Sequence, residues 1–131
     1  MVTMKQHILI VDDDRDELVI YLEALQRLPL NIKCTYAESA EHALQMLDHL
    51  VPDFIFLDVN MPKVDGLECL KRIREQEKLS KVQVIMFSNG MNDTLQEKVI
   101  KLGADGCHQK ACDIRTLSEK LIEILQLSTA H

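Results

Sequence analysis

The amino-acid sequence predicts an α/β domain built on a doubly wound, five-stranded parallel sheet. Apolar runs rich in β-branched residues alternate with segments of helical period along the chain, which is the pattern of repeated β-α-β units. The 131 residues suit one domain with one core. Pro29, Pro52 and Pro62 all fall between predicted elements, where they interrupt no backbone hydrogen bonding.

Five segments have the composition of β-strands, namely residues 7–11, 32–37, 54–57, 83–87 and 106–109. The first, third and fourth are almost continuously apolar, as expected for central strands that helices cover on both faces. The second and fifth are more polar, so we expect them at the two edges of the sheet.

Helical segments separate these strands. Leucine and tyrosine side chains recur at helical spacing from Leu18 to Leu28 and predict a first helix, which Pro29 closes. The expected boundary residues of the later helices are Ser39 for the second, Gly66 just before the third, Asn92 or Asp93 and then Gly103 for the fourth, and Asp113 for the fifth.

Charge and hydropathy exclude several classes of protein. The net charge of −6 and pI near 5.3 argue against a nucleic acid or an anionic membrane as the main partner. The apolar run 8–11 is far shorter than the ~7–15 residues of a signal-peptide core or the ~20 of a membrane span. The four cysteines form no C-x-x-C pair, which favours reduced thiols. We therefore expect a cytoplasmic protein.

Polar side chains gather where the predicted strands end. Asp12 and Asp13 follow the first strand, Asp58 the third, Ser88 the fourth and Lys110 the fifth. Ligand sites of such sheets lie at the carboxyl ends of the strands, so we expect these residues to form one site.

The residue types at this site suit phosphoryl chemistry. Carboxylates ~5 Å apart repel by roughly 3 kcal/mol per pair at an effective dielectric of ~20, and Mg²⁺ or Mn²⁺ relieves that repulsion. A lysine and a hydroxyl then complete a cradle for a phosphoryl group, in which Asp58 is best placed as the nucleophile. Taken singly, the acids at 12–14 are equally well explained as residues that a helix N-terminus favours through its dipole. Lys110 alone is most simply explained as a solvated surface lysine.

Taken together, these motifs resemble the receiver domain of two-component response regulators, over residues 6–126. The matching segments are I-L-I-V-D-D-D (8–14), P-D (52–53), L-D-V-N-M-P (57–62), D-G (65–66), V-I-M-F-S (84–88) and G-A-D-G (103–106), which leads to Lys110. The resemblance implies a flavodoxin-like sheet of order 2-1-3-4-5 with five helices, in one receiver domain over residues 1–131.

The resemblance also implies residue roles. Asp58 would accept phosphoryl from a histidine kinase or a histidine phosphotransfer protein, with Ser88 and Lys110 as the other catalytic residues. Asp13 and Asp58 would hold Mg²⁺ (or Mn²⁺), helped by Asp12 and the backbone carbonyl of Asn60. The chain would catalyse only its own aspartyl phosphorylation and dephosphorylation.

Such a phosphorelay switch would act on an unknown downstream protein through protein–protein contacts. We expect a monomer or weak dimer that contacts neither nucleic acid nor membrane directly and has no attached output domain.

Three positions depart from the family pattern. Ala111 replaces the proline that usually follows the lysine, and because a cis bond before a non-proline residue costs ~2.5–4 kcal/mol, we expect a trans peptide and a differently aimed Lys110. Cys107 replaces a common aromatic switch residue. Asn89 is bulkier than the usual residue and is expected to narrow access to Asp58.

Two alternatives use the same residues differently. A haloacid-dehalogenase-type phosphohydrolase needs D-x-D-x-[TV] at 12–16, but Asp16 fails the last position and the chain lacks room for a cap. A receiver-like interaction module that is never phosphorylated is suggested by the three departures.

Overall fold

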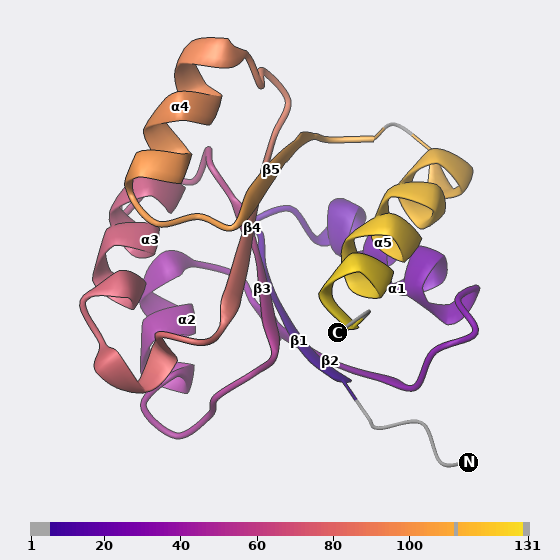
Figure 1. Ribbon diagram of the computed structural model, residues 1–131, viewed down its shortest axis with the longest axis horizontal. Helices are drawn as coiled ribbons and strands as arrows, with labels where there is room; N and C mark the ends of the chain where they lie inside the picture. The colour runs from indigo at the N-terminus through magenta and orange to yellow at the C-terminus, as the bar shows by residue number, and fades with distance from the viewer. Residues whose placement is uncertain (1–5, 112, 130–131) are drawn as a thin grey trace.

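The computed structural model describes residues 6–111 and 113–129. Its five strands form one parallel sheet in the order β2-β1-β3-β4-β5 (Figure 1). The strands are β1 (Gln6–Val11), β2 (Ile32–Ala37), β3 (Phe54–Asp58), β4 (Gln83–Ser88) and β5 (Gly106–Gln109). The helices are α1 (Arg15–Gln26), α2 (Ala40–Met46), α3 (Gly66–Arg74), the short 3-10 helix η1 (Glu77–Leu79), α4 (Asp93–Lys101) and α5 (Ile114–Thr129).

The predicted fold class and strand order are confirmed, and the two polar strands, β2 and β5, lie at the edges. Strands β3 and β4 each run one residue further than predicted, so Asp58 and Ser88 are the last residues of their strands. Helix α1 ends at Gln26, before the predicted end at Leu28, because the N–H of Arg27 turns back to the carbonyl of Ala24. Leu28 is nevertheless buried beyond the helix end.

Helices cover both faces of the sheet, as Figure 1 shows: α2, α3 and α4 lie on one face, and α1 and α5 on the other. Alternate residues of each central strand point to opposite faces, which produces two apolar cores. Leu9 and Ile55 pack with α2 and α3 in one core, whereas Ile8 and Phe56 pack with α1 and α5 in the other. The sheet is thus a rigid platform whose strand ends hold side chains in fixed positions.

Side-chain caps fix where the helices begin. Ser39 accepts a hydrogen bond from the N–H of His42, as its predicted capping role requires. Asp65 caps α3, so Gly66 is the first helical residue rather than the residue before the helix. Asn92, and not Asp93, caps α4. Gly103 follows that helix at φ +108°, a conformation that favours glycine.

None of the helices in the described ranges combines the length and apolar character needed to span a membrane. Cys34, Cys69 and Cys107 are free thiols, and Cys112 lies outside the described residues.

Candidate functional site

The carboxyl ends of the strands bring together the buried polar side chains. Asp12, Asp58 and Ser88 are only 1%, 4% and 2% exposed, and no other polar or charged residue in the described ranges is this deeply buried. They end, or directly follow, the neighbouring strands β1, β3 and β4. Burying ionisable groups is unfavourable unless they are paired or bind a ligand, so this cluster is the strongest candidate site.

The two carboxylate oxygens of Asp58 have different partners. Oδ1 accepts a hydrogen bond from the N–H of Asn60 at 3.0 Å, and Oδ2 lies 3.2 Å from the ammonium of Lys110. The loop after β3 returns so closely that a Cβ on Gly66 would lie 2.1 Å from the carbonyl oxygen of Asp58. The backbone at Asp58 is therefore packed against the start of α3 so closely that a residue with a Cβ fits at position 66 only if the loop shifts.

Lys110 reaches three carboxylates at once. Its ammonium lies 2.5 Å from Glu17, 3.2 Å from Asp58 and 3.6 Å from Asp12, and its side chain is 10% exposed. The described residues contain no cis peptide bond, so the Lys110–Ala111 bond is trans as expected. The N–H of Lys110 donates to the carbonyl of Ser88 at 2.9 Å, which ties the end of β5 to β4.

Burial and pairing shift the pKa values of these groups. Burial raises the pKa of Asp12 to about 8, and its hydrogen bond with Glu17 acts in the same direction. Burial also raises the pKa of Asp58, although the charge of Lys110 opposes that rise. Burial lowers the pKa of Lys110, but the hydrogen bond to Glu17 and the nearby carboxylates outweigh it and leave that pKa raised. Lys110 is thus a fixed positive charge beside carboxylates that ionise reluctantly.

The hydroxyl of Ser88 faces the same space. Its Oγ accepts hydrogen bonds from the backbone N–H of Gly90 at 3.1 Å and from the side-chain amide of Asn60 at 3.4 Å. The loop that follows Ser88 is tied to β5, since Gln109 accepts from the N–H of Met91 and donates to the carbonyl of Asn89. Asn89 itself is exposed, and its expected effect on access to Asp58 stays a prediction.

The donor chemistry of the cluster fits a hard divalent cation. Asp12, Glu17 and Asp58 each offer a carboxylate oxygen, and the three oxygens lie within 4.8 Å of one another. All-oxygen sets of this kind suit Mg²⁺ or Mn²⁺. Asp13 is exposed and is not one of these three, so its predicted role as a direct ligand stays a prediction, as does that of the Asn60 carbonyl.

The place of Glu17 in this site was not predicted from the sequence. Because Asp14 and Asp16 are acidic residues at the start of α1 as well, the charge of Glu17 alone does not distinguish it. The signal lies in its spacing, since Glu17 precedes Tyr21 and Leu25 by one and two helical steps of four residues and so shares their sheet-facing side.

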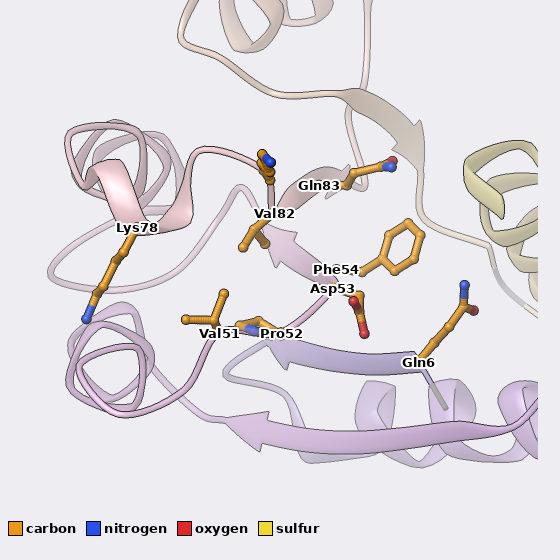
Figure 2. A pocket seen from close by; sticks show the side chains of 9 residues that line it. Gln6, Val51, Pro52, Asp53, Phe54, Lys78, Val82 and Gln83 are labelled. Carbon is orange, nitrogen blue, oxygen red and sulfur yellow. The ribbon is translucent and has the colours of Figure 1, made fainter. Parts of the chain in front are cut away.

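A pocket also lies at the opposite end of the sheet from this cluster, at the amino ends of the strands (Figure 2). It encloses about 370 Å³ and is lined by Gln6, Val51, Pro52, Asp53, Phe54, Lys78, Lys81, Val82 and Gln83. Asp53 accepts a hydrogen bond from the N–H of His7 at 2.8 Å, which explains it as a structural residue. The charged side chains of this amino-end pocket are all exposed.

The comparison with known families distinguishes among the three interpretations of the sequence: a phosphorylated receiver domain, a phosphohydrolase and an unphosphorylated interaction module. The family model described as the response regulator receiver domain matches residues 8–122. The chain belongs to this family. Receiver domains are signalling switches of two-component systems rather than enzymes that turn over a separate substrate. The dehalogenase-type hydrolase and the unphosphorylated module are accordingly not favoured.

Individual relatives agree with this assignment. The nitrate/nitrite response regulator protein NarL of Escherichia coli K12 is 33% identical over 106 residues, which cover 70% of this receiver domain and 48% of NarL. The CpxR homolog of Haemophilus influenzae is 34% identical over 125 residues, which cover 94% of this chain and 52% of that protein. The chain thus spans about half the length of the curated relatives it matches.

Solved structures show the same fold. The phosphorylated cyanobacterial phytochrome response regulator RcpA has a TM-score of 0.85 at 23% identity, with 98% of each chain covered. The Mn²⁺-bound form of the response regulator Rcp1 has a TM-score of 0.80 at 21% identity, with 92% of each chain covered.

Proposed function

We propose that this receiver domain accepts a phosphoryl group on Asp58 and works as the switch of a two-component phosphorelay. The observation that carries the proposal is the position of Asp58, a 4% exposed carboxylate that ends β3 and lies 3.2 Å from Lys110. Family membership supports the phosphoryl-accepting role in general. The geometry supports the choice of Asp58 as the acceptor.

The chain's own residues supply nucleophile, charge and orientation. A carboxylate oxygen of Asp58 forms a bond to phosphorus while the bond from phosphorus to the leaving group of the donor breaks, and the leaving group takes up a proton. The Asn60 N–H keeps the carboxylate oriented. Lys110 offsets the negative charge on the transferred oxygens. The Oγ of Ser88 accepts hydrogen bonds from Gly90 and Asn60, so the hydroxyl proton of Ser88 can be donated to the phosphoryl group.

A divalent cation, Mg²⁺ or Mn²⁺, belongs to this proposal. When bound, it would neutralise charge on the phosphoryl oxygens and the carboxylates. Asp13 and Asp58 would hold it directly, helped by Asp12 and the Asn60 carbonyl. The carboxylate cluster that includes Asp12 and Asp58 supports this assignment, and the Mn²⁺-bound form of Rcp1 is consistent with it.

The remaining predictions concern the setting of the switch. We propose a histidine kinase or histidine phosphotransfer protein as the donor, an unidentified downstream protein as the target, and a cytoplasmic location. We also propose that the chain catalyses its own phosphorylation and dephosphorylation. We further propose that residues 1–131 form a single receiver domain and that the protein is a monomer or weak dimer. Size-exclusion chromatography with light scattering, before and after phosphorylation, tests the oligomeric state.

Intact-mass analysis tests the acceptor directly. The protein is incubated with Mg²⁺ and a small acyl phosphate, and we expect one phosphate on the wild type and none on Asp58→Asn. The matched control is Asp53→Asn, the same change at the exposed amino end next to β3, which should take up phosphate like the wild type. A wild type without an adduct, or an Asp58→Asn variant with one, would refute the proposal.

A further inference from the structure

The closest partner of Lys110 is a residue outside the expected site. Glu17, in the first turn of α1, approaches the ammonium to 2.5 Å, whereas Asp58 lies at 3.2 Å and Asp12 at 3.6 Å. The side chains of Lys110 and Glu17 are 10% and 26% exposed, so solvent screens their interaction only in part.

The surroundings of Lys110 make Glu17 decisive for where the ammonium lies. The backbone of Lys110 is fixed by its hydrogen bond to the Ser88 carbonyl. The side chain of Lys110 borders a cavity of about 210 Å³ on the α1 side, which Ile20, Tyr21 and Leu117 also line. The cavity gives a flexible four-carbon side chain room to turn away from Asp58. Glu17 lines the same cavity and attracts the ammonium toward α1.

We propose that Glu17 is a positioning residue of the phosphoryl site: it shares the ammonium of Lys110 with Asp58 and adds a carboxylate charge to the cluster. This inference rests on the proposed phosphorylation of Asp58. The carboxyl groups of Asp12, Glu17 and Asp58 meet the one ammonium of Lys110, so Glu17 makes the cluster more negative than Asp12, Asp58 and Lys110 alone would make it.

Two opposite effects follow from this extra negative charge. It attracts a divalent cation, and it repels a phosphodonor, which is itself an anion. Unit charges about 5 Å apart interact appreciably even at an effective dielectric of 20 or more. Glu17 therefore strengthens cation binding and slows phosphoryl transfer at saturating cation.

The test compares Glu17→Gln with Asp16→Asn. Both changes remove one acidic charge from the first turn of α1. Of the two residues, Glu17 contacts Lys110, whereas Asp16 is exposed. Calorimetric titration with Mn²⁺ and Mg²⁺ measures cation affinity without phosphorylation. Intact-mass time courses at saturating Mg²⁺, over a range of acyl phosphate concentrations, measure kcat and KM for phosphoryl transfer.

We expect Glu17→Gln to weaken cation binding about three- to tenfold and to lower the KM for the phosphodonor several-fold, with Asp16→Asn within about twofold of wild type in both. A merely structural tie between α1 and β5 would change the melting temperature and neither of these quantities. Equal behaviour of the two variants, or a raised KM in Glu17→Gln, would overturn the inference.

The proposed function fails separately, through a wild type that gains no phosphate. In that case unchanged cation affinity in Glu17→Gln still counts against the role of Glu17, and weakened affinity still supports its charge contribution.

Discussion

The two ends of the parallel sheet both carry charged residues and a pocket, yet they differ in how those charges are placed. At the amino ends the pocket is larger, about 370 Å³ (Figure 2), but its charged lining residues Asp53, Lys78 and Lys81 are exposed. At the carboxyl ends the cavity is about 210 Å³, and Asp12, Asp58 and Lys110 are almost wholly enclosed. Buried charge, rather than the size of a hollow, distinguishes the functional end.

The largest expected effect comes from the glycine that supports Asp58. In Gly66→Ala the new methyl group would lie 2.1 Å from the Asp58 carbonyl oxygen and 2.7 Å from the Cα of Val59, so the loop after β3 must shift. We expect a loss of about 2–4 kcal/mol in the free energy of unfolding, and phosphorylation slowed more than about tenfold because Asp58 moves with its backbone.

The control for that prediction is Gly90→Ala. A Cβ at Gly90 meets nothing within 4 Å, so stability should stay within about 0.5 kcal/mol of wild type. Urea unfolding and intact-mass time courses measure both variants. Equal stability of the two variants would show that the close approach at Gly66 is not required.

A medium effect is expected from the buried carboxylate of Asp12. Its pKa is raised to about 8 from an ordinary 3.8, so its contribution to stability is full below pH 3.8 and is lost as pH rises toward 8. Without metal, we expect Asp12→Asn to be about 1–2 kcal/mol more stable than wild type at a pH of about 8.5, and its stability to depend less on pH.

Urea unfolding with a chelator, repeated with saturating Mg²⁺, measures this effect. Added Mg²⁺ should stabilise wild type more than Asp12→Asn, because the cation binds the folded site of wild type more tightly. Identical pH dependence of the two proteins would contradict the assignment of Asp12 as the group that titrates.

The smallest effect belongs to the amino ends. The side-chain oxygen of Gln6 is buried without a hydrogen-bond partner among the described residues, so Gln6→Met removes a desolvation penalty. We expect a gain of about 0.5–1 kcal/mol by urea unfolding and no change in cation affinity by calorimetry. A weakened cation affinity would mean that the two ends of the sheet are coupled, which would break the contrast between them.

The sequence predicted the parts of the site that depend on strand order. Asp58 and Ser88 close recognisable apolar runs, Lys110 follows the more polar segment 106–109, and parallel strands bring such positions to one end of the sheet. Glu17 depends instead on the rotation of α1 about its axis, and several neighbouring acids compete for that role. The trans peptide at Lys110 followed from the energetics of cis bonds, but the nearest partner of its ammonium depended on packing between α1 and β5.

The end of α1 shows a similar limit. The apolar stripe extends to Leu28, and Leu28 is buried as the stripe predicts. The helix nevertheless ends at Gln26, because periodicity identifies the side chains that face the core and not the backbone conformation that places them there.

The positions of the two tyrosines have an optical consequence. The protein has no tryptophan and only Tyr21 and Tyr36. Tyr21 lines the cavity beside Lys110, and the hydroxyl of Tyr36 donates to the backbone oxygen of Asp12 at 2.7 Å. All of the tyrosine emission therefore originates next to the acidic cluster, and the unlabelled protein carries its own fluorescent reporter of events at Asp58.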